Sequence, residues 1–312
     1  MVNQTLQVMK SRFLFPRRLK PLGWLLVVPG FVLGYLALYR DYKIPGFSMS
    51  VWPASEAFHG PVTQDLTKTL ALLLIITGLL FIAFSKEKKE DELTVRIRQN
   101  ALYWSVLISY IIYLAWLIVA ITIELLNLGK DPLGGLADAL GISIYNLFTP
   151  LIIFIARYYY LRYSKNGEYK VGKMYYLPEK PYKIIGQLIS VPLLLLIIIS
   201  FTGSWFFKGD IELKDWAGTL MLLLPIALLM WGYSRRSEED EFISTLRLES
   251  MQLAVYFNYA VLLLANFFFY FLDFMLVMFF NLGTIALFFV LRFSYVLWKS
   301  NNERHAKGIL TL

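Results

Sequence analysis

The sequence contains no cysteine and two histidines, His59 and His305, among its 312 residues. The absence of cysteine excludes disulfides, iron–sulfur clusters, thiolate zinc sites and cysteine nucleophiles. Two histidines are too few for a bis-histidine haem or a histidine-based metal centre. Charged residues are also scarce, at 17% of the chain against about 25% in a typical soluble domain. We therefore expect neither a soluble enzyme nor a disordered chain, and we expect no cofactor and no metal ion.

Apolar residues are abundant instead, at 58% of the chain, and they come in blocks of bilayer-spanning length. A helix rises 1.5 Å per residue, so about 20 apolar residues cross about 30 Å of hydrocarbon. The sequence therefore predicts an all-α integral membrane protein with eight transmembrane helices. Pro150 and Pro225 fall inside two of them and predict kinks. The predicted spans cover 22–39, 66–84, 101–123, 139–161, 184–206, 216–233, 249–271 and 274–298.

The basic residues predict the orientation of these helices. If the N-terminus is inside, 24 of the 30 Lys and Arg residues fall in inner segments and six in outer ones. Such an asymmetry places both termini in the cytoplasm, and we expect the chain in the cytoplasmic (inner) membrane of a bacterium. The net charge of +8 then reflects topology, and no direct binding of nucleic acid is expected.

The two halves of the chain share several short patterns, which predict an internal duplication. The separation between matching positions is 163 at the first helix, 149 around the acidic triplets and 135 near the end, so it changes in the loops. The matching segments are Gly23 and Pro29 with Gly186 and Pro192, Glu90–Glu92 with Glu239–Glu241, Arg98 with Arg247, Tyr110 with Tyr259, Tyr145–Thr149 with Phe280–Thr284, and Arg157 with Arg292.

Four helices per repeat is an even number, so both repeats insert the same way up, around a pseudo-two-fold axis along the membrane normal. The predicted organisation is a cytoplasmic segment over 1–21, a first repeat over 22–163 and a cytoplasmic linker over 164–183. The linker is followed by a second repeat over 184–298 and by a cytoplasmic tail over 299–312.

The acidic triplets are the first candidate site, because they stand on a predicted inner face that is otherwise basic. Each precedes a helix and is followed by an arginine, and such clusters suit a basic cytosolic partner. Capping of the positive helix ends is the alternative explanation, with a pair between Glu92 and Arg96 four residues on. The predicted partner-binding residues are Glu90, Asp91, Glu92, Arg98, Glu239, Asp240, Glu241 and Arg247.

A polar seam is the second candidate site, on the fourth and eighth predicted helices. In each helix an Asn, a Thr and an Arg share one face, since they lie within about 80° of one another at 100° per residue. They would either line a ligand cavity or hold the bundle together by hydrogen bonds between helices. These residues are Asn146, Thr149 and Arg157, and Asn281, Thr284 and Arg292.

Two acids, Glu124 and Asp273, are predicted to end the third and seventh helices on the outer side. A proton-coupled transporter would place such an acid in a cavity, whereas an ordinary helix end would leave it solvated. Catalysis is not expected, because there is no intramembrane histidine for a peptidase, acyltransferase or phosphatase. The sequence also has neither a P-loop nor a glycine-rich dinucleotide turn.

Residues 238–250, Phe280–Thr284 and Arg292-Phe293 resemble an uncharacterised family of bacterial multi-pass membrane proteins, often encoded beside a very small helix-turn-helix regulator. The resemblance covers mainly the second half. It implies that the chain holds or modulates such a regulator at the inner surface.

The sequence thus favours a non-enzymatic membrane regulator or scaffold. Its expected partners are the lipid bilayer and a small basic cytosolic protein, with a homodimer left open. The alternative is a small-solute or lipid transporter with a polar site between the repeats.

Overall fold

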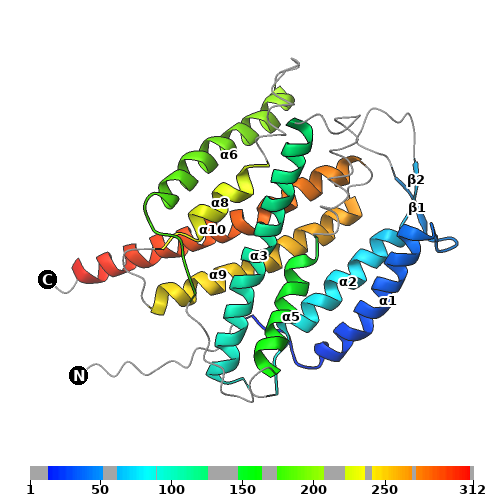
Figure 1. Ribbon diagram of the computed structural model, residues 1–312, viewed down its shortest axis with the longest axis horizontal. Coiled ribbons are helices and arrows are strands. Elements are labelled where there is room, and N and C mark those ends of the chain that lie inside the picture. Colours follow the sequence, from blue (N-terminus) through cyan, green and yellow to red (C-terminus); the bar gives the residue numbers. More distant parts are fainter. Residues whose placement is uncertain are drawn as a thin grey trace. The chain divides into compact units, whose positions relative to one another are not determined.

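The computed structural model describes residues 13–51, 62–88, 90–125, 147–163, 174–206, 222–235, 241–268 and 272–309. These residues are mainly helical, with one short antiparallel hairpin (Figure 1). Six of the described helices are long and apolar enough to cross a membrane. The chain is therefore an all-α membrane protein, as the composition predicts.

The chain divides into two compact units. Unit 1 comprises Met1–Ile111, Ile123–Lys173 and Tyr259–Met278, and unit 2 comprises Ile112–Thr122, Met174–Asn258 and Phe279–Leu312. The units follow the two halves of the sequence with two exceptions. Part of the third predicted helix belongs to unit 2, and part of the seventh with the start of the eighth belongs to unit 1.

The elements of the first half are α1 (Leu19–Tyr39), α2 (Thr67–Phe84), α3 (Glu92–Leu125), α5 (Thr149–Tyr163) and a hairpin of β1 (Ser48–Val51) and β2 (Val62–Asp65). The hairpin is antiparallel, with Ser48 opposite Asp65. The elements of the second half are α6 (Tyr182–Phe206), α8 (Leu224–Gly232), α9 (Glu241–Phe268) and α10 (Leu272–Ile309). Every predicted span thus contains a helix, though α5 and α8 have 15 and 9 described residues and are not among the six candidate spans.

Two predicted kinks are absent, because the prolines concerned begin helices. Pro150 is the second residue of α5, and Pro225 is the second residue of α8. A proline in the first turn is tolerated, since the missing N–H has no partner within the helix there. The prolines that do lie inside helices are Pro29 in α1 and Pro192 in α6.

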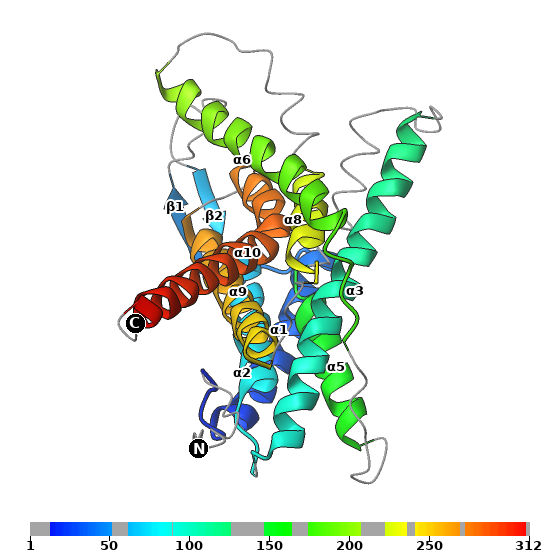
Figure 2. The ribbon, with the colours of Figure 1, turned by 90° about the vertical axis from the view of Figure 1, so that its left-hand side faces the viewer.

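The first two helices of each half lie side by side: α1 against α2 in unit 1, and α6 against α8 in unit 2 (Figures 1 and 2). A glycine on the first helix allows this approach in both units. A methyl group at Gly23 would lie 2.7 Å from the carbonyl oxygen of Gly78, and one at Gly186 would lie 2.7 Å from that of Ala227. Small residues let backbones approach in this way in membrane proteins.

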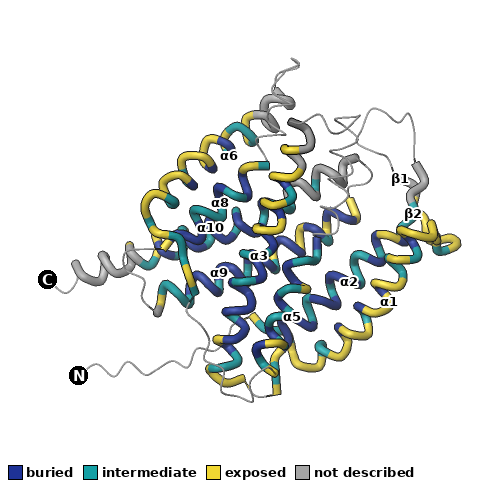
Figure 3. The backbone as a smooth tube through the Cα atoms, in the orientation of Figure 1, coloured by how far each residue is buried: buried dark blue, intermediate teal, exposed yellow. Residues whose placement is uncertain are grey.

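Burial distinguishes the helices of each unit (Figure 3). In unit 1, α2 supplies the fully buried Ile76 and Phe84, whereas α1 exposes large apolar side chains such as Leu25, at 69%. In unit 2, Leu228 of α8 is fully buried, whereas Leu188 of α6 is 72% exposed. An apolar outer face on α1 and α6 is expected of helices whose solvent is lipid.

Candidate functional site: a buried arginine at one end of each unit

In both units, the segment before the first helix pairs with the residue after the second helix. In unit 1, the Phe15 N–H donates to the carbonyl of Phe84 and the Lys86 N–H donates to the carbonyl of Phe15, both at 2.9 Å. These two bonds form a parallel bridge between Phe15 and Ser85.

Unit 2 has the same arrangement. The Leu177 N–H donates to the carbonyl of Tyr233 at 2.9 Å, and the Arg235 N–H donates to the carbonyl of Leu177 at 2.6 Å. The bridge here joins Leu177 and Ser234. Along the chain, each bridge stands shortly before an acidic triplet and its arginine.

Arg98 of α3 is the centre of the arrangement in unit 1. Its guanidinium donates two hydrogen bonds to the Glu90 carboxylate, at 3.1 and 3.0 Å, and its side chain is only 5% exposed. The guanidinium also lies 5.7 Å from the centre of the Tyr158 ring. That ring ends a stack of Phe84, Phe154 and Tyr158, with centroids 5.0 and 6.1 Å apart.

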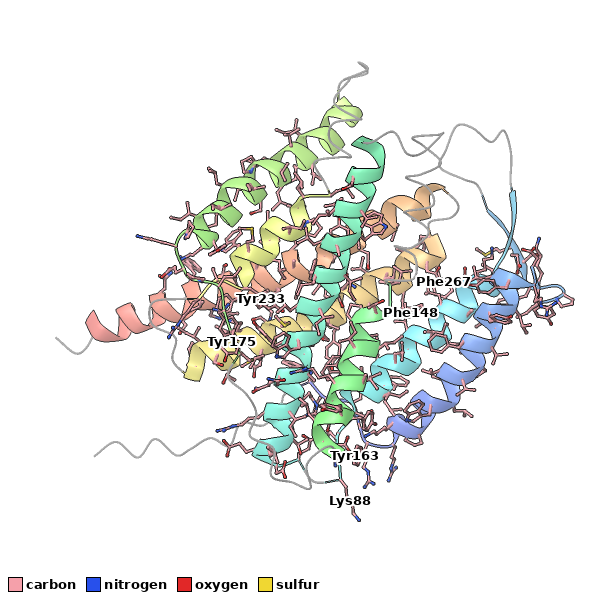
Figure 4. The ribbon with its side chains drawn as sticks, viewed as in Figure 1. Lys88, Phe148, Tyr163, Tyr175, Tyr233 and Phe267 are labelled. Carbon is pink, nitrogen blue, oxygen red and sulfur yellow. The ribbon has the colours of Figure 1, made fainter. Side chains whose placement is uncertain are left out.

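Arg247 of α9 occupies the corresponding place in unit 2, at 1% exposure. It donates hydrogen bonds to the carbonyls of Gly232 and Ser234. Its guanidinium lies between two rings, 4.4 Å from the centre of Tyr176 and 4.8 Å from that of Phe293. The ring of Tyr233, labelled in Figure 4, contacts the ring of Phe289, and Phe289 stacks on Phe293.

The two arginines have different hydrogen-bond partners, but several of the residues around them correspond. Arg98 and Arg247 are 149 residues apart, as are Phe84 and Tyr233 at the bridges. The stacked pair Phe154 and Tyr158 matches Phe289 and Phe293 at a separation of 135. These are the separations that the sequence patterns predict for those regions.

All three carboxylates of the first acidic triplet have partners within the protein. Glu90 binds Arg98, and the Asp91 carboxylate accepts a 2.7 Å hydrogen bond from the Thr94 N–H at the start of α3. Glu92 pairs with Arg96 as predicted, in an ion pair whose side chains are 60% and 57% exposed. Glu239 and Asp240 lie outside the described residues, and Glu241 is the first residue of α9.

The electrostatics of Glu90 and Asp91 follow from these bonds. Partial burial opposes ionisation of Glu90, but hydrogen bonds from Arg98 and from the Glu87 N–H outweigh it, so the pKa of the Glu90 carboxyl lies below its usual value. Hydrogen bonds from Thr94 lower the pKa of Asp91. Both groups are therefore held in the charged form.

Glu87 is a functional candidate that the sequence analysis does not identify. Its carboxylate binds the ammonium of Lys20 and the guanidinium of Arg162, the latter at 3.1 Å. It also accepts a 3.2 Å hydrogen bond from the Tyr158 hydroxyl. In Figure 4 this ion pair can be located by the labels of Lys88, which follows Glu87 in the chain, and of Tyr163, which follows Arg162. The sequence shows Glu87 only as one acid in a basic run, which gives no signal of a buried ion pair.

Three members of the polar seam bond to the neighbouring helix of their own unit. Arg157 donates to the Asn100 side-chain oxygen at 3.1 and 2.9 Å, and Asn281 donates to the Asn258 side-chain oxygen at 3.0 Å. Arg292 donates to the hydroxyl of Ser250 at 2.6 Å. Thr149 begins α5, Thr284 is half-buried on α10, and Asn146 lies outside the described residues. The partners Asn100, Asn258 and Ser250 are buried and come from α3 and α9.

The two predicted outer acids differ in their position. Glu124 is the last residue but one of α3, as predicted. Asp273 instead is the second residue of α10, because α9 ends at Phe268. An acid is favourable in the first turn of a helix, where it interacts with the positive end of the helix dipole.

No protein-family model matches the chain, and no curated protein and no solved structure matches it either. Among the residues that the structure describes, no group of three or more His, Cys, Asp or Glu side chains is arranged to hold a metal ion.

Proposed function

We propose that the chain is a duplicated, non-enzymatic membrane protein of eight spans, with two four-helix repeats inserted the same way up. The support is the correspondence of contacts between the units. The bridges, the glycine contacts, the aromatic stacks and the buried arginines occur in both halves. Several independent contacts at the predicted separations favour a common origin of the halves over chance similarity.

The orientation follows from the distribution of Lys and Arg. Both termini and both acidic triplets are on the cytoplasmic side of a bacterial inner membrane, because that side then carries 24 of the 30 basic residues. The bridge residues Ser85 and Ser234 and the buried arginines closely flank the triplets along the chain, so we assign them to the cytoplasmic face.

The function that this geometry supports best is docking of a small basic cytosolic protein. The observation that carries it is the exposure of Asp91 and Glu92 at the start of α3, while Glu90 is held by Arg98. Asp91 is also fixed in place by its hydrogen bond to Thr94, and Glu92 by its exposed ion pair with Arg96. A basic partner would therefore meet two pre-arranged carboxylates and would compete with Arg96 for the second. A small helix-turn-helix regulator is such a basic protein, and the chain would act as its membrane-bound regulator or scaffold.

Transport of a small solute or lipid is the other function that the sequence allows, and it has less support. Arg157, Asn281 and Arg292 each bond to a neighbouring helix of their own unit. Such bonds account for the polar residues without a ligand, since a polar side chain within the membrane needs a partner.

Neutralising the exposed carboxylates with Asp91→Asn and Glu92→Gln is expected to abolish co-purification of the basic partner. Asn caps a helix as well as Asp does, so the double variant keeps the start of α3 and loses only charge. The measurement is a mild-detergent pull-down from native membranes, followed by mass spectrometry.

Asp41→Asn is the matched control, because Asp41 is an exposed acid beyond the other end of α1. Partner recovery should be unchanged by this control. A double variant that recovers as much basic protein as the wild type would contradict docking at this site, and uptake assays with Asn281→Ala would then test transport.

A further inference from the structure

Exposed basic side chains surround the parallel bridge of unit 1. Lys86 follows the bridge directly, and its backbone N–H bonds to Phe15. Arg17 and Arg18 follow Phe15 at the start of α1, and Lys88 lies two residues beyond Lys86. All four side chains belong to exposed residues. We refer to Arg17, Arg18, Lys86 and Lys88 as the basic rim.

The positive charge of this rim is not neutralised within the described part of the unit. Lys20 and Arg162 lie close by, but both bind Glu87. The rim residues themselves form no ion pair with a described carboxylate. Four positive charges gathered around one bridge therefore suit an anion.

Unit 2 also has exposed basic residues beside its own bridge. Arg235 follows Ser234 directly, just as Lys86 follows Ser85, and its N–H bonds to the bridge residue Leu177. Lys180, shortly before α6, is also exposed. Exposed basic residues therefore lie beside the start of the first helix in both halves.

The helix that begins at each rim exposes an apolar surface within its first two turns. On α1, Trp24 is 50% and Leu25 is 69% exposed; on α6, Ile184 is 53% and Leu188 is 72% exposed. Arg18 and Leu25 are seven residues apart, which is about 10 Å along a helix. A positive rim next to an apolar face is complementary to a molecule with an anionic head and hydrocarbon chains.

We propose that each unit binds an anionic phospholipid, with the headgroup phosphate on the basic residues beside the bridge and the acyl chains along the exposed face of α1 or α6. A free phosphate would use the rim alone and would leave the apolar face without a role. This site is separate from Asp91 and Glu92, so it does not depend on the docking function.

The test is lipid retention by the purified full-length protein in detergent, measured by native mass spectrometry. Dioleoylphosphatidylglycerol is compared with dioleoylphosphatidylcholine, which has the same chains and no net charge. We expect selective retention of the anionic lipid, weakened as the salt concentration rises. The variant Arg17→Gln, Arg18→Gln, Lys86→Gln should weaken the site of unit 1 at least tenfold, since each basic residue at an anionic membrane surface contributes about a factor of five. The variant should then retain the lipid of unit 2 and lose that of unit 1.

Arg96→Gln is the matched control, because Arg96 is an exposed arginine at the same end of unit 1 whose charge is paired with Glu92. It should leave lipid retention unchanged. Equal retention of the two lipids, or an unaffected triple variant, would overturn the proposal. Displacement of the lipid by millimolar inorganic phosphate would also overturn it, since the site would then recognise the anion alone.

Discussion

Replacing Glu90 with Gln lowers the stability of the protein by about 2 kcal/mol, because the substitution leaves the buried guanidinium of Arg98 without its counter-charge. Removing one partner of a fully buried ion pair costs about 3 to 5 kcal/mol. The cost is smaller here because the Glu90 side chain is 26% exposed, although that of Arg98 is 5% exposed. The measurement is the apparent melting temperature in detergent, which should fall by about 3 °C.

Two variants test this explanation of the loss. Glu92→Gln removes a carboxylate from an exposed ion pair, and it should change stability by less than about 0.5 kcal/mol. Adding Arg98→Met to Glu90→Gln removes the uncompensated charge and should restore part of the stability. Equal destabilisation by Glu90→Gln and Glu92→Gln would contradict a special role for the Glu90–Arg98 pair.

The same pair predicts a pH dependence. The pKa of Glu90 lies below its usual value of 4.5 in the folded protein. Its contribution to stability is therefore complete above about pH 4.5 and is lost as the pH falls through the lower, folded pKa. On acidification the melting temperature of the wild type should fall more steeply than that of Glu90→Gln, and the two should converge. Parallel curves would show that Glu90 does not titrate with folding.

Gly23→Ala and Gly186→Ala are expected to destabilise the protein by about 1 to 3 kcal/mol each, the usual cost of overpacking. The added methyl would meet backbone atoms, which cannot rotate away. At Gly23 the obstacle is the Gly78 carbonyl oxygen, and at Gly186 it is the Ala227 carbonyl oxygen and the Trp231 nitrogen, all at 2.7 Å. The first two helices of a unit would have to separate.

Gly34→Ala is the control for this prediction, since Gly34 lies on the same helix as Gly23. A methyl group there would approach Ile75 no closer than 3.7 Å, which is ordinary contact. Alanine also favours a helix more than glycine does, so Gly34→Ala should be neutral or slightly stabilising. A neutral Gly23→Ala or Gly186→Ala would contradict the close approach.

The positions of the helices could be predicted from sequence, because a span must be both apolar and about 20 residues long. Helix α1 begins three residues before the predicted span 22–39 and ends at the same residue. Helix α6 begins two residues before the predicted span 184–206 and also ends at the same residue. The helix ends were harder to predict. Asp273 and Pro225 are each the second residue of a helix. Proline is tolerated and an acid is favourable at such a position, but hydrophobicity reports neither preference.

The candidate site was less predictable than the helices. The sequence indicates that Glu90, Asp91 and Glu92 form a group with Arg98, but not that Glu90 is committed to Arg98 while Glu92 remains exposed. That difference depends on which side of the helix start faces the protein interior. The contact between Glu87 and Tyr158 could not be predicted for a different reason, since it joins residues 71 positions apart.

The central claim is that the chain consists of two repeats of four spans inserted the same way up, and the absence of cysteine makes a direct test practical. Single variants Lys88→Cys, Lys180→Cys and Arg235→Cys place one thiol in successive segments on the proposed cytoplasmic side, and Lys43→Cys places one on the opposite side. Each is treated with a membrane-impermeant maleimide in intact spheroplasts and in inverted vesicles.

The first three thiols should react only in inverted vesicles, and the thiol at position 43 only in spheroplasts. Two membrane crossings separate each of the three cytoplasmic positions from the next, so they share a side only if α5 and α8 belong to complete spans. Labelling of positions 88 and 180 from opposite sides would contradict the eight-span duplicated architecture.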